Sequence, residues 1–104
     1  MPFYSIISST PTSEDWIPSY VASVGAIVAR HGGKYLARTA NFERLEGTGD
    51  NPAAFVLIEW PDKEAGVAFM DDPEYRPFLD ARLAGSVSHH FLIDGNDAFA
   101  APGD

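Results

Sequence analysis

The chain has 104 residues, 7 of them basic and 15 acidic, which gives a formal net charge of −8 at pH 7. This length predicts one domain, and the acidic balance argues against binding to nucleic acid or to an anionic membrane. The absence of cysteine excludes disulfide scaffolds, thiolate metal sites and cysteine nucleophiles. The sequence shows neither the pattern of a secretory signal nor an apolar run of membrane-spanning length, so a cytoplasmic location is expected.

The first third of the chain predicts a strand followed by a helix. Residues 3–8 are aromatic, β-branched or apolar on both faces, which favours a strand. Apolar residues then recur at helical spacing up to His31-Gly32-Gly33, where a glycine is available to end the helix. Its start is ambiguous between Ser13 and Asp15 as N-cap. Asp15 is preferred because Pro18 then lies in the first turn, where its missing N–H costs nothing.

The middle of the chain predicts two further strands. Residues 34–38 form the second strand, which is interrupted at 39–41 by a bulge, a bend or a break and resumes over 42–46. A glycine-rich loop follows at 47–52. The third strand runs from 55 to 60 and is closed by a proline.

The last third predicts two short helices and a strand. Asp62 is expected to cap the first helix, and Asp72-Pro73 restarts helical structure, with Pro77 kinking or delaying the second helix. Residues 87–94 form the fourth strand. Residues 96–104 are expected to form a loose C-terminal tail outside a single domain of residues 1–95.

This order of elements predicts the fold class α+β. Strand, helix, strand, strand, helix pair, strand is a ferredoxin-like βαββαβ arrangement, with a four-stranded antiparallel sheet and the second helix split in two. Helices would cover one sheet face only, yet residues 55–58 and 91–93 are apolar at both parities. The open face therefore needs a partner, and a second copy of the chain is the simplest one. We expect a homodimer.

Several segments resemble a known family in their order and spacing. They are Met1-Pro2-Phe3-Tyr4, His31-Gly32-Gly33-Lys34-Tyr35-Leu36-Ala37-Arg38, Leu45-Glu46-Gly47, Val56-Leu57-Ile58-Glu59-Trp60-Pro61, Asp72-Pro73-Glu74-Tyr75 and Leu92-Ile93-Asp94-Gly95. Together they resemble the domain-of-unknown-function 1330 family over residues 2–95. The resemblance implies a dimeric α+β barrel, in which two ferredoxin-like subunits pack sheet against sheet. The family usually has two glycines where this chain has Thr39-Ala40, so a different local backbone is expected there.

Two charged residues stand at positions where apolar residues are expected. Glu59 lies in an apolar strand, and Arg82 lies on the inward stripe of a helix. A buried lone charge is costly, so each needs a partner. If the face of Glu59 meets the helices, the two form either a structural ion pair or the polar end of a ligand pocket; alternatively, both reach solvent.

The histidines offer one candidate proton carrier. His89 and His90 are neighbours on a strand and point to opposite faces, so they cannot easily share a metal. His89 shares the parity of the apolar residues around it and is therefore expected to face inward, as a general base or as an ordinary core residue. His31 is expected to serve the end of a helix. No metal site is expected.

The aromatic residues suggest a pocket for a small organic molecule. Tryptophan and tyrosine combine an apolar ring with one polar group, so they suit such a ligand, although they also suit a core or an interface. The residues concerned are Trp16, Tyr20, Tyr35, Trp60 and Tyr75. In a pocket, Arg82 or Arg38 would orient an anionic group of the ligand. The candidate ligand-binding residues are therefore Arg38, Arg82, Tyr75 and Trp60.

Two functions remain open at this stage. The superfamily to which the resemblance points includes cofactor-free monooxygenases, lactone isomerases and haem enzymes, whereas the family itself has no established activity. One hypothesis is a cofactor-independent enzyme, monooxygenase- or isomerase-like, with a small apolar or anionic substrate and with His89 or Glu59 as the proton carrier. The alternative is a non-catalytic ligand-binding or structural homodimer. No cofactor is expected, because no histidine is clearly placed as an axial haem ligand.

Overall fold

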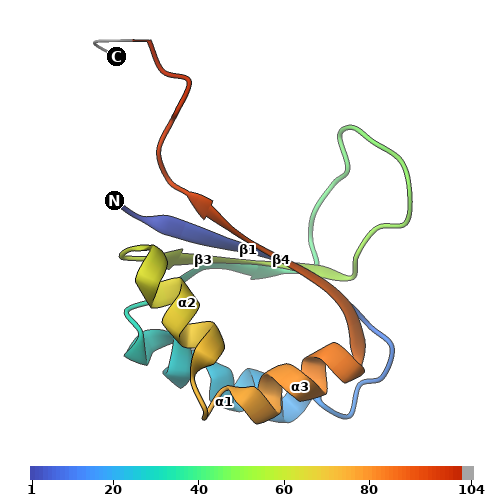
Figure 1. Ribbon diagram of the computed structural model, residues 1–104. Coiled ribbons are helices and arrows are strands. Elements are labelled where there is room, and N and C mark those ends of the chain that lie inside the picture. Colours follow the sequence, from blue (N-terminus) through green and yellow to red (C-terminus); the bar gives the residue numbers. More distant parts are fainter. Residues whose placement is uncertain (102–104) are drawn as a thin grey trace.

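The computed structural model describes residues 1–101 and contains strands and helices in the predicted order. Within those residues the elements are β1 (Phe3–Pro11), α1 (Ile17–Arg30), β2 (Lys34–Thr39), β3 (Ala54–Trp60), α2 (Lys63–Asp71), α3 (Arg76–Ala84) and β4 (Ser86–Asp94). All three helices lie against the same face of the sheet (Figure 1). None of the helices in this part of the chain is long and apolar enough to cross a membrane.

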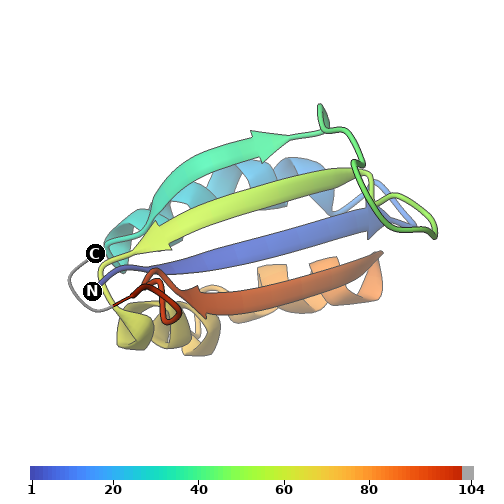
Figure 2. The same cartoon turned by 90° about the horizontal axis from the view of Figure 1, so that it is seen from above.

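The sheet has four strands in the order β2-β3-β1-β4, and every neighbouring pair is antiparallel (Figure 2). The central strand β1 pairs along its whole length with β4, from Phe3 opposite Asp94 to Pro11 opposite Ser86. This arrangement confirms the predicted ferredoxin-like subunit with a split second helix.

The helix starts follow from a few local residues. Asp62 caps α2 as predicted, because its Oδ1 accepts a hydrogen bond from the backbone N–H of Ala65 at 2.9 Å. The N-cap of α1 is Trp16, which makes no side-chain capping bond, so the prediction of Asp15 is wrong. Pro18 does lie in the first turn, where a missing N–H is harmless. Pro77 likewise lies in the first turn of α3. That helix therefore begins at Arg76, and Pro77 does not kink it.

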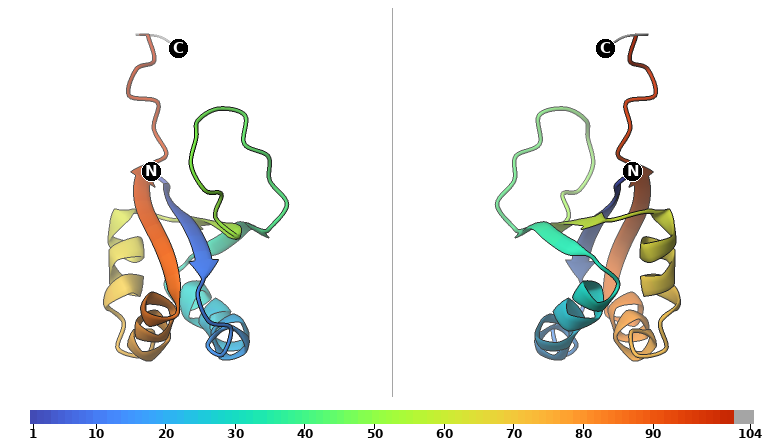
Figure 3. Two further views of the ribbon diagram at one scale, coloured as in Figure 1. Left: turned by 90° about the vertical axis from the view of Figure 1, so that its right-hand side faces the viewer. Right: turned by 90° about the vertical axis from the view of Figure 1, so that its left-hand side faces the viewer.

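The predicted resumption of the second strand over residues 42–46 is wrong. β2 ends at Thr39, and residues 40–53 form a loop without strand structure. The bulge lies earlier than predicted: Leu36 is the extra residue between Tyr35, which pairs with Ile58, and Ala37, which pairs with Leu57. The loop and the segment after β4 both extend from the sheet on the side away from the helices (Figures 1 and 3).

The core lies between the sheet and the three helices. From β3 it receives Ile58 and Trp60, and from α1 it receives Val24, Ile27 and Val28, all buried. β3 therefore turns its even-numbered residues toward the helices.

The opposite face of the sheet is apolar and uncovered in the single chain. Three apolar side chains stand side by side across it, because Ile6 of β1 pairs with Leu57 on one side and with Phe91 on the other. Phe91 is 64% exposed, and Val87 and Ile93 beside it on β4 are also exposed. The unoccupied apolar face foreseen in the sequence is thus present. Of the predicted tail, residues 102–104 lie outside the described part of the chain.

Candidate functional site

A cavity of about 370 Å³ lies between α1 and the sheet. Its wall is mainly apolar, with side chains from both layers: Ile17, Val21 and Val24 from α1, and Ile7, Val56 and Ile58 from the sheet. Val21, Arg38 and Thr39 are exposed members of the wall and mark its mouth between α1 and β2. Phe69 and Arg82 are buried members and mark its inner end. A cavity of this size and apolarity suits a small organic molecule.

Three of the aromatic residues expected at a pocket do line this cavity: Trp16, Tyr20 and Tyr35. Trp16 is fixed at the start of α1 because its Nε1–H donates a hydrogen bond to the carbonyl oxygen of Gly85 at 3.0 Å. Its ring meets Tyr20 edge to face, with 5.4 Å between the centroids. The wall is therefore held in place by contacts between elements that are distant in sequence.

Arg82 is a charged side chain at the inner end, and it has no counter-ion among residues 1–101. It is 4% exposed. Its Nη2 donates a long hydrogen bond of 3.5 Å to the hydroxyl of Tyr75, whereas Nε and Nη1 have no partner among residues 1–101. No carboxylate of the described residues forms an ion pair with it. A buried guanidinium left in this state is costly unless something else meets it.

Two tyrosines join Arg82 to the cavity. The hydroxyls of Tyr20 and Tyr75 are 2.6 Å apart. Tyr75 is fully buried and does not line the cavity, whereas Tyr20 does. Burial, and next the neighbouring Tyr75, raise the pKa of Tyr20 far above its usual value, so its hydroxyl keeps its proton at neutral pH.

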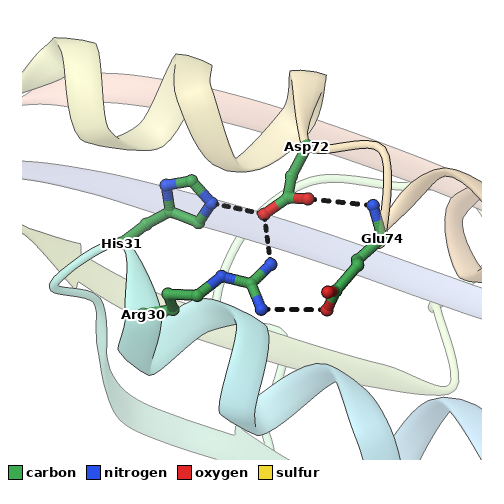
Figure 4. A network of polar contacts seen from close by, with 4 residues as sticks. All are labelled: Arg30, His31, Asp72 and Glu74. Atoms are coloured by element: carbon green, nitrogen blue, oxygen red, sulfur yellow. Dashed lines mark hydrogen bonds and ion pairs between the residues drawn. The ribbon is translucent and has the colours of Figure 1, made fainter.

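A polar network holds the segment that carries Tyr75 (Figure 4). Asp72 Oδ2 accepts from Arg30 Nη2 at 2.5 Å and lies 2.7 Å from His31 Nε2, while Arg30 Nη1 donates to Glu74 Oε2 at 2.9 Å. Hydrogen bonds from His31 and Arg30 hold the pKa of the Asp72 carboxyl well below its usual value. This network ties the end of α1 to the turn between α2 and α3. His31 thus serves a helix end, as expected.

Arg38 lies at the mouth of the cavity and is exposed. Its guanidinium carbon is 4.0 Å from the centroid of the Tyr35 ring. The bulge at Leu36 brings the two together, because Tyr35 and Arg38 pair with Ile58 and Val56, which both face the helices. Thr39 and Ala40, where the family usually has glycines, also line the mouth.

The expectation that His89 faces inward is wrong. His89 is exposed and has the same parity as the open-face residue Phe91, whereas His90 points toward the helices. His90 Nε2 is 2.7 Å from the Oγ of Ser5, a buried hydroxyl that also accepts from Trp60 Nε1–H at 2.8 Å. Burial, and next the charge of Arg82, lower the pKa of His90. The more apolar parity of β4, which contains Val87, Phe91 and Ile93 beside His89, lies on the open face, so the pattern pointed to the wrong side.

Of the alternatives for Glu59 and Arg82, the ion pair does not form, because the two residues lie on opposite sides of the sheet. Glu59 lies on the open face of β3, next to Lys34 of β2 and Tyr4 of β1 in the register, while Arg82 lies under the other face. Trp60 is fully buried and is not part of the cavity wall. The described residues contain no group of histidine and carboxylate side chains that could hold a metal.

Sequence reasoning missed the roles of Ser5 and His90, and it did not link Tyr20 to Tyr75. The contact between Ser5 and His90 depends on the register of β1 against β4. Tyr20 and Tyr75 are 55 positions apart in the sequence. The available signal was Arg82 on an apolar stripe, which did mark the inner end of the cavity.

Comparison with solved structures supports the fold. A protein of unknown function from Rhodopseudomonas palustris is 18% identical, with a TM-score of 0.76 and coverage of 92% of this chain and 83% of that one. SnoaB, a cofactor-independent oxygenase from Streptomyces nogalater, is 24% identical, with a TM-score of 0.57 and 96% of both chains covered. A dimeric ferredoxin-like protein of unknown function from Jannaschia sp. CCS1 is 13% identical, with a TM-score of 0.62, covering 90% of this chain and 99% of that one.

The family assignment rests on a match along nearly the whole chain. No curated protein matches the sequence. A family model, the domain of unknown function DUF1330, matches residues 2–96. The chain therefore belongs to the DUF1330 family.

Proposed function

We propose that this protein binds a small apolar molecule with one anionic or electron-rich group, and acts on it as a cofactor-independent enzyme of the oxygenase or isomerase kind. The observation that carries the proposal is Arg82. It is buried at the inner end of an apolar cavity, without a carboxylate partner among the described residues and with two nitrogen atoms unpartnered.

The free-energy cost of Arg82 supports a ligand. A buried donor without a partner costs about 1–3 kcal/mol, and more when the group is charged. The fold retains this free-energy cost although the chain carries 15 acidic residues. An anionic ligand would offset the cost on binding, and the apolar wall would provide the remaining affinity.

A specific observation favours a second candidate, a binding protein without catalysis. The cavity wall contains tyrosines, arginines, a serine and a threonine, but neither a carboxylate nor a histidine. The expected proton carriers His89 and Glu59 lie on the other face of the sheet and take no part in this proposal. Any reaction here would have to draw its proton transfer from a tyrosine, from the substrate or from water.

The proposed assembly is a homodimer in which two sheets pack face to face. The exposed row of Ile6, Leu57 and Phe91 supports it, as does the Jannaschia structure, which is described as dimeric. Loop 40–53 stands on this side of the sheet and would flank the second copy (Figure 3). Sedimentation equilibrium at micromolar concentration should give the mass of a dimer; the mass of a monomer would contradict the assembly.

The ligand proposal is tested by thermal unfolding with matched small molecules. We expect 2-naphthoate to raise the melting temperature more than naphthalene does, because only the former offers a carboxylate to Arg82. Arg82→Met should remove the difference. Arg76→Met is the control, since Arg76 lies on the same helix with its side chain 63% exposed. Equal shifts in wild type and Arg82→Met would remove Arg82 from the site.

Catalysis is tested separately from binding. Compounds that raise the melting temperature should be incubated with the protein in air, and products sought by mass spectrometry while dioxygen is followed with an electrode. Turnover that is lost in Arg82→Met supports the enzyme. Binding without any product supports the non-catalytic candidate.

A further inference from the structure

The hydrogen bonds between Arg82, Tyr75 and Tyr20 have only one direction that gives the hydroxyl proton of the fully buried Tyr75 an acceptor. An arginine N–H can only donate, so the oxygen of Tyr75 accepts from Arg82 Nη2 at 3.5 Å. The hydroxyl proton of Tyr75 must then be donated, because this residue is fully buried. The only other polar atom that contacts it within the described residues is the hydroxyl of Tyr20, at 2.6 Å. Tyr20 is therefore the acceptor in that bond.

The direction of these hydrogen bonds determines what Tyr20 can do at the cavity wall. The Tyr20 oxygen accepts from Tyr75, so its own proton is available to another acceptor. No acceptor for it is found among residues 1–101, and Tyr20 lines the cavity. The reverse direction, with Tyr20 donating to Tyr75, would give the Tyr75 oxygen two donors and leave its own buried proton without an acceptor. The chain of hydrogen bonds thus ends at Tyr20, a residue of the apolar cavity wall whose hydroxyl proton has no acceptor among residues 1–101.

We propose that Tyr20 donates a hydrogen bond to a carbonyl or enolate oxygen of the cavity's ligand, with Tyr75 as the positioning residue behind it. The substrate class is then an apolar carbonyl compound that can carry negative charge on that oxygen. This inference rests on the proposed function, because it requires the cavity to bind small molecules. It deepens that function by naming the group recognised and the residue that touches it.

The charge of Arg82 strengthens the donor. Hydrogen bonds in a chain polarise one another, and the effect is larger where water is excluded. The guanidinium withdraws electron density from Tyr75 and, through it, from the hydroxyl of Tyr20. Its carbon atom lies 5.9 Å from the centroid of the Tyr20 ring, so the field also acts directly. Preorganised donors of this kind stabilise an oxyanion more than a neutral carbonyl.

The test compares 2-tetralone with tetralin, two bicyclic molecules that differ in one carbonyl group. Titration calorimetry of the full chain should show the ketone binding about tenfold more tightly than the hydrocarbon, as expected for one net hydrogen bond. Tyr20→Phe should remove this preference while retaining the binding of tetralin. Tyr75→Phe should reduce it, because Tyr20 then loses its donor. Tyr4→Phe, on the open face, should leave it unchanged.

Each alternative result has a definite meaning. If Tyr20→Phe retains the preference, or if Tyr35→Phe abolishes it instead, the assignment to Tyr20 is overturned while the cavity remains a binding site. Equal binding of both molecules by the wild type overturns the carbonyl class in the same way. If neither binds up to its solubility, both this inference and the proposed function fail.

A second measurement does not depend on the variants' folding. The infrared carbonyl stretch of 2-tetralone bound to the wild type should lie at lower wavenumber than in cyclohexane. A stretch at the cyclohexane position would show that no donor reaches the oxygen and would overturn the inference.

Discussion

Replacing Arg82 with methionine should make the protein more stable and should abolish the binding of its proposed ligand. Arg82 brings a 4% exposed charge into the core and leaves Nε and Nη1 without partners among the described residues. Methionine keeps an unbranched apolar stem of similar reach and removes both unsatisfied donors. Buried polar or charged groups replaced by apolar residues of similar shape are often neutral or stabilising.

The expected size of the effect follows from the contacts of the side chain. Two unpartnered donors cost about 1–3 kcal/mol each. Against this stands one hydrogen bond to Tyr75, which is at the limit of length at 3.5 Å and worth less than the roughly 1.5–3 kcal/mol of a good charged bond. The net gain should be about 1–3 kcal/mol in free energy of unfolding. For a domain of this size, each kcal/mol raises the melting temperature by roughly 4–8 °C.

The assay is equilibrium unfolding in urea, followed by circular dichroism at one fixed protein concentration, since the proposed dimer would also contribute to stability. Arg76→Met is the control and should change stability by less than about 0.5 kcal/mol. If Arg82→Met destabilises the protein by more than about 2 kcal/mol, Arg82 serves the fold, and its unpartnered nitrogens are not a ligand-binding feature.

Three further expectations follow from other parts of the molecule. Phe91→Glu should convert the proposed dimer to a monomer in sedimentation equilibrium, because it places a charge in the apolar row of Ile6, Leu57 and Phe91 on the open sheet face; a dimer that persists would move the interface elsewhere. Burial and Arg82 lower the pKa of His90, so the folded protein binds fewer protons than the unfolded chain and loses stability as the pH falls below about 6.5. His90→Gln should flatten this slope between about pH 5.5 and 7.5 in urea unfolding, and an unchanged slope would assign it to another group. The pKa of Asp72 is also lowered, so its contribution to the free energy of unfolding is present above about pH 4 and is lost as the pH falls further. Asp72→Asn should reduce stability at neutral pH and weaken the loss of stability in acid. If the variant and the wild type lose stability in parallel, the Asp72 network does not cause the acid dependence.

The order of the elements could be predicted from local signals alone. Asp62 as a cap and the prolines at Pro18 and Pro77 act within a single turn, so their effects do not depend on the rest of the fold. The bulge at Leu36 could not be placed, because it depends on how β2 pairs with β3. A predicted strand over 42–46 failed because those residues leave the sheet instead of pairing with it.

The site was predictable only in part, since its faces and partners are set by tertiary structure. β3 is apolar at both parities, so its sequence could not tell which side meets the helices, and the inward position of Glu59 was only one of two alternatives. In β4 the more apolar parity lies on the open face. His89 was therefore wrongly expected inside, whereas His90 is the inward histidine. Arg82 was recognisable because a charge on an apolar helical stripe is unusual. Its missing partner could be seen only once the surrounding elements were in place.

The central claim is that the cavity closed by Arg82 binds a small apolar molecule through an anionic or electron-rich group. The most direct measurement is a calorimetric titration of 2-naphthoate into the wild type and into Arg82→Met, both shown to be folded. We expect saturable binding with one site per chain in the wild type and at least about tenfold weaker binding in the variant, because a charged hydrogen bond is lost. Equal affinity for the two proteins, or no binding to the wild type, would contradict it.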